Sequence, residues 1–150
     1  MLGAIAVIWY KIDPSSPIQQ LFARFSLGVF FTFGGFMHFQ KSLVPFYLHL
    51  MPSFLPFKKE LVYLSGVFEI VFGLLMFAPS PFWVNVGAWG VLATLIAVYP
   101  ANINHALSKE VQQKTKMNAT TAYIRLPIQF LFFAWAYINT TMTFEETYHG

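Results

Sequence analysis

The 150-residue chain is 57% apolar and only 10% charged, with a net charge of +3 and no cysteine. Because soluble domains usually carry about a quarter charged residues, this composition argues against a soluble protein and favours one membrane domain covering residues 1–150. The absence of cysteine excludes disulfides and thiolate metal sites within these residues, and no nucleic-acid-binding motif accompanies the few lysines, so no nucleic-acid partner is expected.

Residues 1–10 form an apolar segment that is too short to cross a bilayer, which needs about 20 such residues. No positive residue precedes the segment and no small-residue cleavage site follows it, so a signal peptide is not expected. We expect an interfacial segment that ends where Pro14 and Pro17 interrupt the chain.

Four longer apolar windows follow, each long enough to cross a hydrocarbon core about 30 Å thick. They cover residues 18–39, 61–78, 82–101 and 123–140. Backbone groups in lipid must form hydrogen bonds within their own segment, so each window is expected to be a helix. The sequence therefore predicts an all-α, polytopic membrane protein built as a four-helix transmembrane bundle.

The connectors between these windows differ in character. Residues 40–60 contain three prolines and many large apolar side chains, which favours a membrane-associated or partly re-entrant first loop. Residues 104–122 are polar and basic and are expected to form a solvated loop. We expect Pro100 to kink or end the third helix, and Pro127 to lie in the first turn of the fourth.

Positive charge is concentrated in the two long connectors. With four spans, both connectors lie on one face of the membrane and both termini on the other. The lysines on the connector face are Lys41, Lys58, Lys59, Lys109, Lys114 and Lys116. The positive-inside rule therefore predicts a multi-pass protein of the cell membrane with cytoplasmic connectors and both termini outside.

Glu69 lies near the middle of the second window, where an ionised carboxylate costs several kcal/mol unless it is paired, protonated or hydrated. Helical spacing places it on one stripe with Ser65 and two glycines, and small residues let helices approach closely. Similar stripes in the other windows lead us to expect all four to meet inside the bundle. Either Arg24 or Arg125 is then the expected partner of Glu69.

The polar members of the stripes form a candidate ligand-binding set, with no catalytic residue and no metal site among them. Their histidines and carboxylates lack the spacing of metal ligands. The set consists of His38, Glu69, Asn102, Arg125, Gln129 and Arg24. Structural interpretations stay open beside this one: Glu69 as a register-fixing ion pair, His38 as a polar residue at a membrane boundary, and Arg125 as a side chain reaching lipid phosphates.

Five short motifs, in this order, resemble the DoxX-like family of small bacterial integral membrane proteins. They are GGFMHF at residues 34–39, MPSFLP at 51–56, YLSGVFEI at 63–70, YPANI at 99–103 and RLPIQ at 125–129. The resemblance implies a four-span helical protein with His38, Pro52, Glu69, Asn102, Arg125 and Gln129 as motif residues. It also implies a link to membrane redox complexes, since the family takes its name from a subunit of a thiosulfate:quinone oxidoreductase. The lack of cysteine argues against any direct thiol chemistry.

Three functions follow as hypotheses. The first is an accessory, non-catalytic subunit of a membrane redox system that holds a quinone-like or other amphipathic ligand inside the bundle. The quinone comes from the resemblance, and the partner would be a membrane redox protein. The second is a membrane scaffold or assembly protein with a structural polar core, like a chaperone in a distant animal branch of that family. The third, ranked last, is a small proton-linked transporter acting as a homo-oligomer.

Overall fold

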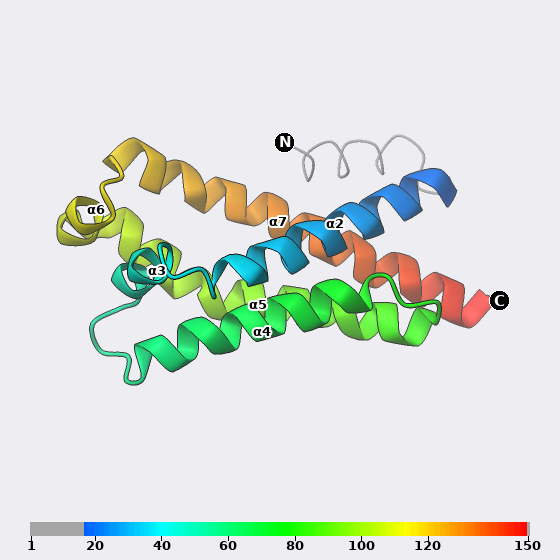
Figure 1. Cartoon of the computed structure of the whole chain (residues 1–150). Helices are drawn as coiled ribbons and strands as arrows, with labels where there is room; N and C mark the ends of the chain where they lie inside the picture. The colour runs from blue at the N-terminus through cyan, green and yellow to red at the C-terminus, as the bar shows by residue number, and fades with distance from the viewer. Residues whose placement is uncertain (1–16, 150) are drawn as a thin grey trace.

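The computed structural model describes the backbone of residues 17–149 and the side chains of residues 18–140. This part of the chain is helical and contains no strand, which confirms the all-α class (Figure 1). The helices are α2 (Pro17–Met37), α3 (Val44–Leu50), α4 (Lys58–Leu75), α5 (Pro81–Leu107), α6 (Lys109–Thr115) and α7 (Ala119–His149). The interfacial segment expected at residues 1–10 lies outside the described residues.

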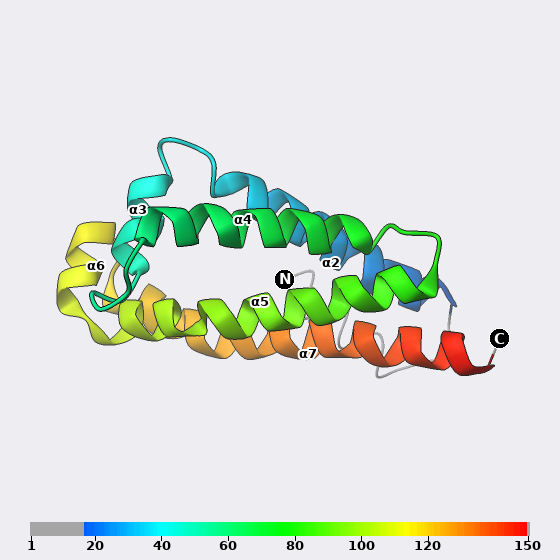
Figure 2. The same ribbon diagram turned by 90° about the horizontal axis from the view of Figure 1, so that it is seen from below.

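The four long helices run side by side as two pairs. Helix α2 packs along α4, helix α5 packs along α7, and α4 contacts α5 between the pairs (Figures 1 and 2). The short helices α3 and α6 lie together at one end of the bundle, which we call the connector end. The turn between α4 and α5 lies at the opposite end, the turn end.

Small residues bring the first pair into close contact, as the stripes predict. A Cβ atom added to Gly28 would lie 2.9 Å from the carbonyl oxygen of Gly73, and one added to Gly73 would lie 2.7 Å from the backbone nitrogen of Thr32. The apolar core continues toward the second pair through Leu27 and Trp135, both almost fully buried. The Trp135 indole N–H donates to the carbonyl oxygen of Ala23 at 3.0 Å and so ties α7 to α2.

The expectation of a solvated loop at residues 104–122 is wrong, since most of this segment is helical. Helix α5 continues through Pro100 to Leu107, and α6 follows after one residue. Side chains hold this corner together, because the Gln112 amide donates to the carbonyl oxygen of Ala106 at 2.9 Å. Ser108 caps α6 by accepting from the backbone N–H of Val111 at 3.3 Å.

Pro127 also lies elsewhere than expected, well inside α7 rather than in its first turn. The helix begins at Ala119, where the preceding Asn118 side chain accepts from the backbone N–H of Thr121 at 2.8 Å. A side-chain oxygen in this role satisfies one of the N–H groups that the start of a helix leaves unpaired. Pro127 removes the hydrogen bond that residue 127 would make to the carbonyl of residue 123, and its ring crowds that carbonyl, yet α7 continues through it.

Two of the described helices are long and apolar enough to cross a membrane. They are Ile18–Met37 of α2 and Pro81–Leu107, which is α5, and an 18-residue window in each has a mean hydropathy of 1.2 and 1.6 respectively. Only 28% and 33% of these windows are buried inside the structure. Large apolar side chains therefore cover the outside of the bundle, for example Phe33 on α2 (63% exposed) and Ile96 on α5 (60% exposed).

Candidate ligand-binding cavity

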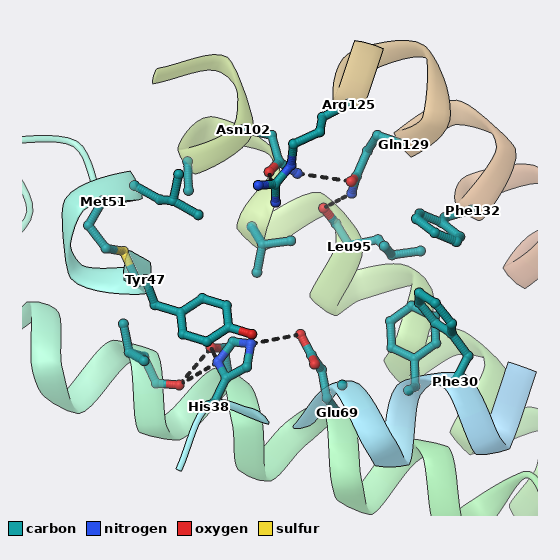
Figure 3. A pocket seen from close by; sticks show the side chains of 17 residues that line it. Phe30, His38, Tyr47, Met51, Glu69, Leu95, Asn102, Arg125, Gln129 and Phe132 are labelled. Atoms are coloured by element: carbon teal, nitrogen blue, oxygen red, sulfur yellow. Dashed lines mark hydrogen bonds and ion pairs between the residues drawn. The ribbon is translucent and has the colours of Figure 1, made fainter. Parts of the chain in front are cut away.

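A cavity of about 170 Å³ lies between the two helix pairs, near the connector end (Figure 3). Apolar side chains form part of its wall, including Phe30, Leu95 and Phe132. The rest of the wall is unusually polar for the inside of so apolar a protein. The polar side chains are His38, Tyr47, Ser65, Glu69, Asn102, Arg125 and Gln129.

One polar wall comes from the α2–α4 pair. The His38 Nδ1–H donates to the carbonyl oxygen of Val62 at 2.9 Å, which leaves Nε2 facing the cavity. Nε2 lies 3.7 Å from Oε1 of Glu69. Because Val62 offers only an acceptor, the ring proton is assigned to Nδ1 in the neutral tautomer. Nε2 therefore presents a lone pair toward the Glu69 carboxyl group, at a distance too long for a direct hydrogen bond.

The opposite wall comes from the α5–α7 pair and consists of a chain of amide hydrogen bonds. The Asn102 amide donates to Oε1 of Gln129 at 2.9 Å, and the Gln129 amide donates to the carbonyl oxygen of Leu95 at 3.2 Å. Nη2 of Arg125 donates to Oδ1 of Asn102 at 3.1 Å. The Arg125 guanidinium also lies over the Phe46 ring, 5.9 Å from its centroid. These contacts fix the amides and leave other guanidinium N–H groups available to a ligand, since an arginine has five.

Residues 27–140 match the family described as a domain of unknown function, DUF8561. The chain belongs to this family. The match runs from α2 to α7 and includes every residue that lines the cavity. No curated protein and no solved structure matches the chain.

Five of the six sequence-derived candidates thus line one cavity of the DUF8561 domain: His38, Glu69, Asn102, Arg125 and Gln129. The sixth, Arg24, does not. Its guanidinium donates from Nε to the carbonyl oxygen of Met76 at 2.6 Å and from Nη2 to that of Ala78, both in the turn between α4 and α5. Arg24 therefore belongs to the turn end, and its expected place in a shared polar interior is wrong.

The expectation that Arg24 or Arg125 is the partner of Glu69 is wrong. The partner of Glu69 is His38. The glycine contacts explain why Arg24 is too far away. Gly28 lies against Gly73 and Gly35 against Gly66, so Glu69 is level with residue 32 of α2. Arg24 is eight residues from that level, about 12 Å along the helix axis. The Arg125 guanidinium, in turn, is on the opposite side of the cavity (Figure 3).

Tyr47 is a cavity residue that the sequence did not single out. Its ring stacks on His38, with centroids 4.1 Å apart and planes at 28°. Burial raises the pKa of its hydroxyl, and the carboxylate of Glu69 raises it further, whereas Arg125 lowers it. The spacing of the long windows carries no signal for this residue, because its position depends on α3 folding back over the end of the bundle.

The arrangement presents a carboxylate with an imidazole on one side and a guanidinium with two amides on the other. Within the described residues, no group of three or more histidine and acidic side chains gathers to hold a metal ion. The cavity instead suits a small planar group that accepts hydrogen bonds at one edge and accepts or exchanges a proton at the other.

Proposed function

We propose that this DUF8561 protein is an integral membrane protein in which α2, α4, α5 and α7 all cross the bilayer. We further propose that it is an accessory, non-catalytic subunit of a membrane redox system and holds the ring of a quinone-like ligand in its cavity. The likeness to the DoxX-like family is part of this proposal.

The outer surface supports the membrane assignment. The core helix of a soluble protein would be largely buried, yet only 28% and 33% of the two apolar windows are buried. Exposed apolar side chains also cover the two remaining long helices, among them Leu64 and Val71 on α4 and Phe130 and Tyr137 on α7. Soluble monomers rarely expose contiguous apolar patches larger than a few hundred Å². Lipid is the solvent in which such an exterior is stable.

The size of the cavity supports a single ring as occupant. An apolar cavity of about 150 Å³ holds one benzene molecule, whereas sites for drug-sized ligands start at about 300 Å³. The 170 Å³ cavity therefore has room for one six-membered ring or for a few water molecules. It has no room for a whole amphipathic lipid.

The proposal rests on one observation: the two polar walls face each other across this cavity. A quinone ring has two carbonyl oxygens on opposite edges. One oxygen would accept hydrogen bonds from Arg125, and the other would face His38 and Glu69. A carboxyl group beside an imidazole is also suited to delivering a proton to a quinone oxygen when an electron arrives from a partner protein.

Binding of a soluble, short-chain benzoquinone to the protein in nanodiscs tests the proposal. We expect Arg125→Gln to weaken binding about tenfold, since it removes a charged hydrogen-bond donor to one ring oxygen. We expect Glu69→Leu to weaken binding by a similar factor, because leucine cannot hold a proton at the other ring oxygen. Arg24→Gln is the matched control, because Arg24 is an arginine of the same bundle that lies at the turn end. Equal affinity in all four proteins would refute the proposed site.

A scaffold function is the second candidate, and the first connector favours it. Phe54 and Phe57 are 78% and 75% exposed, and Phe57 has a left-handed φ of 51°, which is uncommon outside glycine. Both aromatic rings project at the lysine-rich connector end. Photo-crosslinking from position 54 to a membrane partner, together with no quinone binding, would favour this function over the first.

A further inference from the structure

A second hollow opens beside the ligand cavity, on the outside of the bundle between α4 and α5. It is an apolar groove of about 340 Å³, twice the volume of the cavity. Leu64 and Phe68 of α4 form part of its wall and are 47% and 43% exposed. Ala97 and Pro100 of α5 line it from the other helix, and Phe54 of the first connector lies at its end. The groove therefore faces the surroundings of the bundle.

The groove and the cavity share part of their walls. Four residues, Met51, Ser65, Val98 and Ala101, line both, so the two hollows adjoin along these side chains. Ser65 is the point of contact with the polar site, because its hydroxyl lies 3.0 Å from Nδ1 of His38. An occupant of the cavity thus has the groove as its immediate continuation toward lipid.

The groove offers no free polar side chain to an occupant. Its only polar side chains are those of Ser65 and Thr94. The Ser65 hydroxyl donates to the carbonyl oxygen of Val62 at 2.8 Å, and the Thr94 hydroxyl donates to that of Gly90 at 2.8 Å. Both bonds lie within the helix that carries the hydroxyl. The groove therefore suits a hydrocarbon chain and not a second head group.

Close packing ends the groove toward the turn end. A Cβ atom added to Gly90 would lie 2.2 Å from the Phe72 ring, and one added to Gly87 would lie 2.9 Å from the carbonyl oxygen of Phe72. The contact between α4 and α5 is thus sealed there. A chain leaving the cavity between these helices therefore runs outward past Leu64 and Phe68, or toward the connector end, where Pro52, Phe54 and Pro100 also line a further hollow.

We propose that this groove seats the hydrocarbon chain of a single-chain amphipathic ligand whose ring lies in the cavity, and that such ligands enter sideways from the bilayer between α4 and α5. This inference rests on the proposed function, since it takes the ring to occupy the cavity. It adds the class of ligand, one ring carrying one chain, and the side of the bundle from which it comes.

The test compares two benzoquinones that differ only in their chain, a methyl group in one and ten carbons in the other, in nanodiscs. Ala97→Trp fills the groove, and Ile96→Trp is the matched control on the exposed outer face of the same helix. We expect Ala97→Trp to weaken binding of the long-chain quinone at least tenfold and to change binding of the methyl quinone less than twofold. The control should leave both unchanged.

If Ala97→Trp binds both quinones as the wild type does, the groove does not hold the chain, while the proposed function stands. If the wild type binds neither quinone, the proposed function fails and this inference with it. A second measurement covers the case in which the variant misfolds or loses both ligands. A photoreactive diazirine on the chain of the long quinone should label Leu64, Phe68 or Ala97 in the wild-type protein, and labelling confined to α2 or α7 would overturn the proposal.

Discussion

Gly35 of α2 and Gly66 of α4 meet backbone to backbone beside the ligand cavity. A Cβ atom added to Gly35 would lie 2.6 Å from the carbonyl oxygen of Gly66, and one added to Gly66 would lie 2.9 Å from that of Gly35 and 2.6 Å from Cβ of His38. The same contact therefore sets the distance between the two helices and the position of a cavity side chain.

Gly66→Ala should destabilise the protein by about 1–3 kcal/mol, the usual cost of adding a methyl group where there is no space. Because the new methyl group also pushes on His38, quinone binding should weaken as well. Unfolding in detergent measures the first effect. Val67→Ala is the control, since Val67 is the exposed neighbour on the same helix. A Gly66→Ala protein as stable as the wild type would show that α2 and α4 are not held at this distance.

Arg24→Gln should cost stability without affecting the ligand. The guanidinium holds the backbone of the turn at Met76 and Ala78, and hydrogen bonds to charged groups contribute about 1.5–3 kcal/mol each when buried. Because Arg24 is only part-buried, we expect a loss of about 1–3 kcal/mol in unfolding free energy. Quinone affinity should stay within twofold. A loss of quinone affinity without a loss of stability would show that Arg24 contributes to ligand binding after all.

The hydrogen bond between Asn102 and Gln129 should appear as an energetic coupling between α5 and α7. A double-mutant cycle with Asn102→Ala and Gln129→Ala measures it from the unfolding free energies of the four proteins. Interhelical hydrogen bonds in membrane proteins average about 0.6 kcal/mol and reach about 1.7 kcal/mol. We expect a value in the upper part of this range, because Asn102 also accepts from Arg125. Additive single effects would mean that the 2.9 Å bond does not contribute.

Helical spacing was sufficient to find the four long helices and five polar side chains of the cavity, because the face of a helix follows directly from the sequence. It was not sufficient to place each residue along the helix axis. Helical spacing places Arg24 and His38 on one face, yet fourteen residues separate them, about 21 Å along a helix, and His38 lies just beyond the end of α2. Which residues meet across helices depends on register, and the register of α2 against α4 is set by glycine contacts such as Gly35 with Gly66.

Hydropathy also misplaced the end of the third helix, because it contains no information about tertiary hydrogen bonds. Asn102, Asn104 and His105 make the sequence polar after residue 101, which reads as a loop. In the structure, the Asn104 amide donates to the carbonyl oxygen of Leu50 at 2.9 Å, and His105 is fully buried. Partners in other segments thus keep these residues helical. The position of Tyr47 was unpredictable for the same reason.

Tyr47 should make the stability of the protein depend on alkaline pH. Burial raises the pKa of its hydroxyl above the ordinary value of 10.0, so the folded protein holds this proton more tightly than the unfolded chain. The resulting stabilisation is fully present below pH 10 and is lost as the pH rises toward the folded-state pKa. The melting temperature in detergent, measured between about pH 8 and 11, should therefore fall more steeply with pH for the wild type than for Tyr47→Phe. Parallel curves would contradict the burial of this hydroxyl.

The proposed topology predicts which positions are accessible from outside the cell, and a chain without cysteine allows single cysteines to report it without background. Lys59 and Lys114 lie at the connector end, and Ser80 lies in the turn between α4 and α5 at the other. Since lysine-rich connectors favour the cytoplasm, a membrane-impermeant maleimide should label Ser80→Cys in intact spheroplasts. It should label Lys59→Cys and Lys114→Cys only after the membrane is opened. The reverse pattern would invert the protein in the bilayer, and labelling of all three in sealed cells would refute a membrane-spanning bundle.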